Sequence, residues 1–424
     1  MKSIVTLLFT LCIISLNAQE TYLHCGTILD MESGKKWDQK TLIISGKTIK
    51  AIEDGFVEAA EGIKVVDLKD KTVLPGFIDM HVHIEGQSSP TRYIERFTLN
   101  EADVALRSTI YAKNTLLAGF TTVRDLGGSG VNIALRNAIN KGYVKGPRIF
   151  TAGKSLATTG GHADPTNGSK KEWMGDPGPK EGVVNSPEDG KKAVRQRYKD
   201  GSDCIKITAT GGVLSVAKSG RNPQFTIEEI KAITETAKDY GMLTAAHAHG
   251  DEGMQRAVKG GIKTIEHGTF MSEETMDLMK QYDTYMVPTI SAGKKVAENA
   301  KKPGYFPEVV AKKAREIGPI IQDTFAKAYK KGVPIAFGTD AGVFPHGENA
   351  DEFGYMVEAG MPAIEALRSA TITNAKLLGM DDNLGQIKEG YLADIVAVDE
   401  DPLENIGTLK EVIFVMKEGV IYKH

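Results

Sequence analysis

Two histidines one residue apart, His81 and His83, follow an apolar run and have the spacing of a metal-binding pair. A spacing of two places both imidazoles on one face of a β-strand, and Asp79 shares that face. Neutral imidazoles suit a divalent ion of intermediate softness such as zinc. An isolated pair of this kind often binds no metal, so its interpretation depends on the ligand types that accompany it.

The other candidate ligands stand at or near the ends of predicted strands farther along the chain. Each alone could be a buried core residue or a helix cap. Their shared position is informative because parallel strands of a barrel end at one edge, where active sites form. The chain has 9 histidines, so clustering among them is improbable by chance. The residues are Lys206, His247, His249, His267 and Asp340.

Lys206 is the most unusual of these residues because it lies between Ile205 and Ile207 in a strand-like segment. A lysine that points into a protein interior is costly unless it is neutral or modified. The alternative is a side chain that extends to the surface. The strand by itself favours this second interpretation.

Strands and helices alternate between residues 73 and 378. The helix predicted over 226–240, for example, begins with a capping box of Thr226 and Glu229 and stops at Gly241. The eight predicted strands favour a (β/α)8 TIM-type barrel over a doubly wound open sheet. No Gly-x-Gly-x-x-Gly turn follows the first strand, which argues against a dinucleotide fold. The strands are 72–83, 121–125, 148–152, 204–207, 243–247, 264–267, 285–289 and 335–340.

Both ends of the mature chain are rich in short strand patterns. Residues 41–45 and 47–52 form a hairpin pattern across Gly46. The C-terminal part has strand patterns at 394–398, 412–416 and 420–422. We therefore predict a small β-sandwich domain composed of residues 19–72 and 379–424, next to the barrel domain of residues 73–378.

The N-terminus resembles a targeting segment. Lys2 precedes an apolar run from Ile4 to Leu16 that is too short to span a bilayer comfortably. We predict a signal peptide over residues 1–18 and export to the periplasm or the extracellular space; a buried strand or an uncleaved anchor is the alternative. Net charge is −3, without basic blocks, so we expect no nucleic-acid partner.

The ligand set, together with several longer segments, resembles the amidohydrolase superfamily with a binuclear metal centre. More closely, the chain is similar to the prolidase-like branch, which contains Xaa-Pro dipeptidases and imidazolonepropionase-related hydrolases. The resemblance covers nearly the whole mature chain. The segments are Leu74–His83, Gly119–Gly127, Lys206–Val213, Ala246–Gly250, Ile265–Gly268, Gly338–Gly342 and Gly390–Val396.

The resemblance implies a role for each ligand type. It implies two divalent ions, zinc being the expected metal, bridged by a carboxylated Lys206. His81, His83 and Asp340 would hold one ion, whereas His247 and His267 would hold the other. His247 is preferred to His249 because it comes first at its strand end. Asp340 would also be the catalytic base, taking a proton from the bridging water.

Three further histidines are expected to contact the substrate. His162 lies in the long segment 154–185 after the third strand and resembles a substrate-side histidine of the family. His249 and His346 follow the fifth and eighth strands. A solvated loop position is the alternative for His162 and His346. Lys218 and Arg221 are candidates to bind a substrate carboxylate, and Arg124 and Asp125 are predicted to form a buried pair.

The predicted protein is thus a metal-dependent hydrolase that cleaves an amide or peptide bond by attack of a metal-bridging hydroxide. A dipeptide (Xaa-Pro or related) or an N-acyl amino acid is the expected substrate. A cyclic amide or a carbamate is the alternative substrate, and a noncatalytic metal-binding barrel is the alternative class. Mononuclear deaminases usually lack the bridging lysine, so Lys206 argues against them. We expect a homo-oligomer without stable membrane insertion after signal cleavage.

Overall fold

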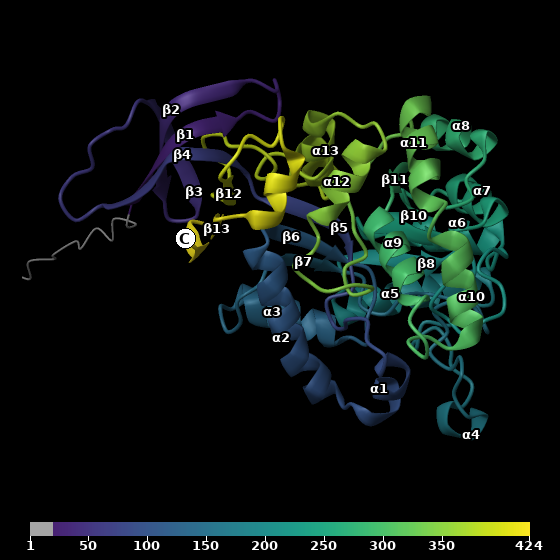
Figure 1. Cartoon of the computed structure of the whole chain (residues 1–424). Coiled ribbons are helices and arrows are strands. Elements are labelled where there is room, and N and C mark those ends of the chain that lie inside the picture. Colours follow the sequence, from purple (N-terminus) through teal and green to yellow (C-terminus); the bar gives the residue numbers. More distant parts are fainter. Residues whose placement is uncertain (1–19) are drawn as a thin grey trace, which may run out of the picture.

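The structure, a computed structural model, describes residues 20–424, so the predicted signal segment lies outside the described residues. A β-sheet built from both ends of the chain lies beside an α/β region built from its middle (Figure 1). Within residues 20–424, no helix is long and apolar enough to cross a bilayer.

The terminal strands form one seven-stranded sheet in the order β14-β13-β12-β4-β1-β2-β3. β4 joins the two ends of the chain, because it pairs in parallel with β1 and antiparallel with β12. The predicted hairpin is confirmed as β2 and β3, paired antiparallel. The strands are β1 (Glu20–Leu29), β2 (Lys36–Ser45), β3 (Thr48–Asp54), β4 (Lys64–Pro75), β12 (Ile395–Val398), β13 (Phe414–Lys417) and β14 (Val420–Lys423).

The terminal sheet curls around its own apolar core. Lys47, in the β2–β3 turn, forms an ion pair with Glu418, in the β13–β14 turn, at 2.7 Å. Buried side chains such as Leu23, Val66 and Phe414 fill the space between. The arrangement differs from the predicted β-sandwich, since hydrogen bonds connect all seven strands into one sheet. Because β4 bonds to strands from both chain ends, the two halves cannot form separate sheets.

The middle of the chain contributes parallel strands, with helices between them. One sheet has the order β5-β6-β7 and another the order β11-β10-β9-β8. The predicted first strand is divided at Gly76, where a Cβ would lie 2.3 Å from Thr121 Oγ1. These strands are β5 (Phe77–Val82), β6 (Phe120–Asp125), β7 (Arg148–Thr151), β8 (Cys204–Thr208), β9 (Leu243–Ala248), β10 (Thr264–His267) and β11 (Tyr285–Val287).

Backbone contacts link the two middle sheets into a TIM-like arrangement. Single bridges join Leu156 to Ile207, Met286 to Ile335 and Val82 to Ala341. The predicted eighth strand, 335–340, is not a regular strand: only Ile335 forms a bridge, and Asp340, with a φ of 61°, leaves the extended conformation. It still follows β5: Met80 N donates to Phe337 O at 3.0 Å, and Asp340 N to His81 O at 2.7 Å.

Amphipathic helices pack against the outside of these strands and bury a common apolar core. The predicted helix 226–240 is confirmed as α6, with the capping box of Thr226 and Glu229 formed and Gly241 at a φ of 66°. The helices are α1 (Arg92–Thr98), α2 (Glu101–Leu117), α3 (Val131–Asn140), α4 (Lys171–Met174), α5 (Pro187–Asp200), α6 (Ile227–Asp239), α7 (Asp251–Lys259), α8 (Glu273–Gln281), α9 (Ile290–Asn299), α10 (Glu308–Ile317), α11 (Ile321–Lys331), α12 (Asp351–Glu358), α13 (Ala363–Ser369), α14 (Ile372–Leu377) and the 3-10 helix η1 (Ile406–Glu411).

Candidate metal centre and active site

The predicted ligands come together in one cavity of about 350 Å³. They lie at or near the carboxyl ends of β5, β8, β9 and β10 and in the irregular eighth segment. The fold therefore converts residues far apart in sequence into one site. The ligand-type residues that line the cavity are His81, His83, Lys206, His247, His249, His267 and Asp340.

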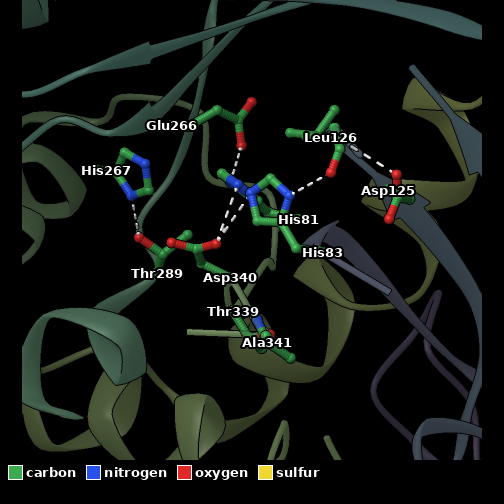
Figure 2. Close-up of polar contacts among 12 residues, drawn as sticks. His81, His83, Asp125, Leu126, Glu266, His267, Thr289, Thr339, Asp340 and Ala341 are labelled. Atoms are coloured by element: carbon green, nitrogen blue, oxygen red, sulfur yellow. Dashed lines mark hydrogen bonds and ion pairs between the residues drawn. The ribbon is translucent and has the colours of Figure 1, made fainter. Parts of the chain in front are cut away.

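Four of these imidazoles are held by a partner on Nδ1. With Nδ1 engaged, Nε2 is the ring nitrogen that remains available to a metal ion. Figure 2 draws several of these contacts. The partners are Glu266 Oε2 for His81 (2.9 Å), Gly127 O for His83 (2.8 Å), Thr269 Oγ1 for His249 (2.8 Å) and Thr289 Oγ1 for His267 (2.7 Å).

His81 and Asp340 face each other with atoms that lack a hydrogen-bond partner. His81 Nε2 lies 3.5 Å from Asp340 Oδ1, and His83 Nε2 lies 3.4 Å from the same oxygen (Figure 2). Within the described chain, His81 Nε2 and Asp340 Oδ1 are buried without a hydrogen bond. Buried polar atoms are rarely left unpaired. A nitrogen and a carboxylate oxygen that converge in this way fit a bound divalent cation.

A second group of possible ligands adjoins the first. The ligand atoms of His247, His249 and His267 all lie within 4.8 Å of one another, as do those of His81, His267 and Asp340. The two groups meet at His267, whose one remaining ring nitrogen can bind a single ion, so the groups form one continuous cluster of possible ligands. The structure brings His249 into the same group as His247, and the predicted choice between these two histidines stays a prediction.

Burial keeps the imidazoles neutral. It lowers the pKa of His83 to about 3 and the pKa values of His81, His247 and His267 well below the usual range, and Lys206 contributes to each shift. The neutral ring is the form that binds a metal, so no proton has to be displaced from these nitrogens near neutral pH.

Lys206 and Asp340 have pKa values that move toward each other. Burial lowers the pKa of Lys206 to about 8, against the opposing effect of Glu266 and Asp340. Burial raises the pKa of Asp340 to about 7, against the opposing effect of Lys206. Lys206 is 3% exposed and lines the cavity, so the alternative of a surface lysine is wrong. An amine of this kind, partly neutral near pH 8, is a suitable nucleophile toward carbon dioxide.

His162 lines the cavity, and its contact with a substrate stays a prediction. Its ring stacks on His247 with centroids 4.3 Å apart, and its Nδ1 is buried without a hydrogen-bond partner in the described chain. A Cβ at Gly212 would lie 2.2 Å from the His162 ring, so only glycine leaves room for it there.

His346 is buried beside the site and does not line the cavity. Its Nε2 lies 3.0 Å from Gly86 O, its Nδ1 lies 3.4 Å from Thr115 Oγ1, and its ring stacks on Tyr111. Both ring nitrogens thus have partners within the protein. The structure does not bring His346 to a position from which it would contact a substrate in this cavity.

Arg124 and Glu266 form a buried ion pair that no pattern in the sequence indicated. Arg124 Nη2 pairs with Glu266 Oε1 at 2.9 Å, and both side chains are fully buried. The predicted Arg124–Asp125 pair is wrong. Asp125 instead accepts from Asn132 Nδ2 at 2.7 Å and from Ile84 N at 2.8 Å. Neighbouring residues of a strand point to opposite faces, which keeps Arg124 and Asp125 apart.

Asp79 joins the first strand to the segment that carries Asp340. Its Oδ2 accepts from Thr339 Oγ1 at 2.7 Å and from Asn349 Nδ2 at 2.8 Å, while its Oδ1 accepts from His81 N at 3.0 Å. This buried network holds two ligand-bearing segments in register. The signal in the sequence was the shared strand face of Asp79 and His81.

The walls of the cavity are mainly apolar, with arginines at one side. Arg92 and Arg96 of α1 line it, together with aliphatic side chains of α9, α10 and α11. Lys218 and Arg221, the predicted carboxylate contacts, are not among the lining residues. Arg221 instead lies over the Phe270 ring and pairs with Glu316.

Comparisons with known proteins identify the family of this chain. The chain matches the model of the Amidohydrolase family over residues 72–422. A solved Xaa-Pro dipeptidase with methionine bound in its active site is 53% identical, with a TM-score of 0.93, and the match covers 96% of this chain and 100% of that one. A prolidase solved with N-methylphosphonate-L-proline is 32% identical, with a TM-score of 0.87, over 96% and 100% of the two chains.

A curated relative also matches nearly the whole chain. Ochratoxinase of Aspergillus niger is 32% identical, over 96% of this chain and 87% of that protein. Matches over nearly the full length of both chains, around a cavity that gathers the predicted ligands, lead to one assignment. The chain belongs to the amidohydrolase family, in its prolidase-like branch, and is a metal-dependent hydrolase of carbon–nitrogen bonds.

Proposed function

We propose that the protein hydrolyses the amide bond of a small substrate with a free carboxylate, either a dipeptide (Xaa-Pro or related) or an N-acyl amino acid. The observation that carries the proposal is a pair of buried atoms, His81 Nε2 and Asp340 Oδ1, that face each other in the cavity and have no hydrogen-bond partner among residues 20–424. The 53% identity to a Xaa-Pro dipeptidase supports the substrate class.

The residues around the cavity fit two divalent ions, zinc being the proposed metal. His81, His83 and Asp340 would hold one ion, and His247 and His267 the other. Lys206, carboxylated on Nζ, would be a ligand of both. Two such ions, when bound, acidify water and polarise the scissile carbonyl. Carboxylation would convert a costly buried amine into an anionic ligand.

The protein's own side chains would move the proton. Asp340 is the proposed base that accepts a proton from the attacking water and passes it to the leaving nitrogen. Its burial favours a pKa near neutrality, which suits both accepting and donating. His162, whose buried Nδ1 has no hydrogen-bond partner in the part of the chain that the structure describes, and His249 are proposed to contact the substrate.

Arg92 is the proposed partner of the substrate carboxylate. Its Nη1 donates to Gly342 O at 3.1 Å, and no described carboxylate forms an ion pair with its guanidinium. A cation without a counter-ion beside an apolar cavity favours an anionic ligand. Gly342 is two residues from Asp340, so a substrate carboxylate bound by Arg92 would lie close to the bond that is hydrolysed.

The test is turnover by metal-reconstituted protein on matched substrates. We would measure kcat/KM for Xaa-Pro and Xaa-Arg dipeptides and for N-acyl amino acids, each beside its C-terminal amide. Faster hydrolysis of the free acids supports the proposal. Metal-dependent turnover only of cyclic amides or carbamates would replace the substrate class, and metal binding without turnover would support a noncatalytic barrel.

We further infer a (β/α)8 barrel of residues 73–378, in which the irregular segment 335–340 serves as the eighth strand. The composite β domain would contain residues 19–72 and 379–424. Export to the periplasm or outside the cell, after removal of residues 1–18, and assembly into a homo-oligomer complete the proposal.

A further inference from the structure

A loop that follows β8 forms one wall of the cavity. We call residues 210–223 the cavity loop. Its two ends are hydrogen-bonded to each other: Thr210 and Pro223 form a β-bridge, and Gly211 N donates to Asn222 O at 3.1 Å. The side of the loop that faces the cavity consists of Val213, Leu214, Ser215 and Val216.

The carbonyl groups inside the cavity loop converge on one side chain from a distant helix. Lys313 of α10 donates from Nζ to Gly212 O at 2.7 Å, Ser215 O at 2.7 Å and Ala217 O at 2.8 Å. An ammonium group has three N–H donors, and here all three are used. The ammonium group therefore has no N–H donor left for a ligand.

Lys313 occupies an unusual position for a lysine. The residue is 5% exposed, and burial lowers its pKa to about 8. Its neighbour Lys312, on the same helix, is exposed. Burial of a cation among carbonyl groups costs solvation free energy, and an apolar residue would avoid that cost. A requirement for one fixed conformation of the cavity loop would explain this arrangement.

The cavity loop also contacts two histidines of the site. Gly211 O lies 3.1 Å from His247 Nε2, and Gly212 lies against the ring of His162. On the other side of the cavity, Tyr93 of α1 donates from its hydroxyl to Leu214 O at 2.8 Å. Movement of the loop would therefore change both the wall and the surroundings of these rings.

We propose that Lys313 is a positioning residue for substrate selectivity: its ammonium holds the cavity loop in one conformation, so that Val213, Leu214 and Val216 form a fixed apolar wall for a substrate side chain. The proposal rests on the proposed function for its substrate. Loss of the ammonium would remove the donor shared by three carbonyls, one buried and two partly buried, and the loop would then adopt several conformations.

The experiment compares Lys313→Met with Lys312→Met in the full-length, metal-loaded protein. We expect Lys313→Met to raise KM for the best dipeptide about tenfold, with kcat within about threefold of wild type, because the wall contributes to binding. Discrimination between dipeptides that differ by one methylene should largely disappear. Lys313→Arg keeps the N–H donors and the charge, so its KM should lie between those of Lys313→Met and wild type. Lys312→Met should have the KM and kcat of wild type.

Limited proteolysis gives a measure that does not depend on turnover. Lys218 is an exposed trypsin site within the cavity loop. Its cleavage, followed by mass spectrometry on folded protein, should be at least about fivefold faster in Lys313→Met, because local opening exposes the bond. Failure of the proposed function would appear as absence of turnover in wild type, with this difference in proteolysis intact.

Two results would overturn the proposal. One is equal cleavage after Lys218 in wild type and Lys313→Met. The other is a lower kcat with unchanged KM, which is what a purely structural role produces by reducing the active fraction. If Lys313→Met does not fold, Tyr93→Phe provides the test, because it removes the hydrogen bond from the Tyr93 hydroxyl to Leu214 O in the cavity loop. This variant must then also raise KM for the proposal to stand.

Discussion

Glu266 links His81 to Arg124 beneath the metal centre. One carboxylate oxygen lies 2.9 Å from His81 Nδ1, and the other accepts from Arg124 Nη2 at 2.9 Å. All three side chains are at most 1% exposed. A buried carboxylate on Nδ1 fixes the orientation of the imidazole and makes Nε2 a better metal ligand.

Replacement of Glu266 by Gln should therefore weaken metal binding. We expect a loss of about 10- to 100-fold in affinity for zinc, which is usual for a lost partner of a ligand histidine. Arg124 would also lose its counter-charge, which should lower the free energy of unfolding by about 3 kcal/mol. Metal titration and urea unfolding measure the two effects. The control is Glu273→Gln, an exposed residue of α8; equal zinc affinity in the two variants would contradict the role.

Lys206→Ala tests the proposed carboxylated lysine. The variant should lose bound metal and activity, because a ligand of both ions is removed. Short carboxylic acids such as acetate should restore part of the activity by occupying the space left by the side chain. Metal analysis and rates with and without acetate would be measured. A variant with the metal content and rate of wild type would exclude Lys206 as a ligand.

Lys417 gives a prediction about stability and pH. It is 7% exposed, its Nζ donates to Gly146 O at 2.7 Å, and burial together with Arg148 lowers its pKa to about 8. An unfolded lysine titrates near pH 10.4, so the unfolded chain binds more protons between about pH 8 and 10.4. The contribution of Lys417 to the free energy of unfolding must then rise with pH across this window.

Lys417→Met lacks this titration. Relative to the variant, wild type should gain about 2 kcal/mol of unfolding free energy from pH 8 to pH 10. Urea unfolding at several pH values measures the difference, and Lys423→Met, at an exposed position of β14, serves as the control. A difference that stays constant or falls would show that the folded-state pKa of Lys417 is not depressed.

Arg92→Met tests the carboxylate contact. For substrates with a free carboxylate we expect kcat/KM to fall about 100-fold, since a charge-assisted hydrogen bond of roughly 3 kcal/mol is lost. The C-terminal amides should lose much less. Arg195→Met, at an exposed position of α5 away from the cavity, should behave as wild type. Equal losses on acids and amides would assign Arg92 a structural role.

Most of the metal centre was predictable because its residues lie at or near strand ends. Strand periodicity locates His81 and His83, and the parallel arrangement explains why Lys206, His247 and His267 reach the same edge. The order of strands around the site follows from their order in the chain. Strand patterns in the sequence are therefore enough to assign ligands that lie far apart in the chain to one cavity.

Other parts of the site depend on contacts that no local pattern encodes. Glu266 and Arg124 stand on strands 142 positions apart, and either could have bonded elsewhere. Arg92 stands on a short helix, outside the strand-end pattern. His346 follows the strand-end rule in sequence, but hydrogen bonds to Gly86 and Thr115 keep it out of the cavity. Side-chain partners of this kind follow from packing and not from spacing.

Replacement of Asp340 gives the clearest test of whether the protein is an enzyme or a noncatalytic metal-binding barrel. Its buried Oδ1 has no hydrogen-bond partner in the described chain and lies within 3.5 Å of Nε2 atoms of His81 and His83. Its left-handed backbone, with a φ of 61°, turns the chain directly after the ligand position. A residue that only stabilised this turn would act through its backbone, and Asn adopts the same conformation readily.

We therefore predict that Asp340→Asn folds with a thermal midpoint close to that of wild type but loses nearly all kcat. Loss of a general base costs about 10²- to 10⁴-fold, and the weaker metal ligand adds to that loss. At least one metal should stay bound, because His81 and His83 remain. The acidic limb of the wild-type kcat/KM profile should report a group that must be deprotonated, and this limb should be absent from the residual activity of the variant. Near-wild-type turnover by Asp340→Asn, with both metals bound, would remove Asp340 from catalysis and leave it only a structural role.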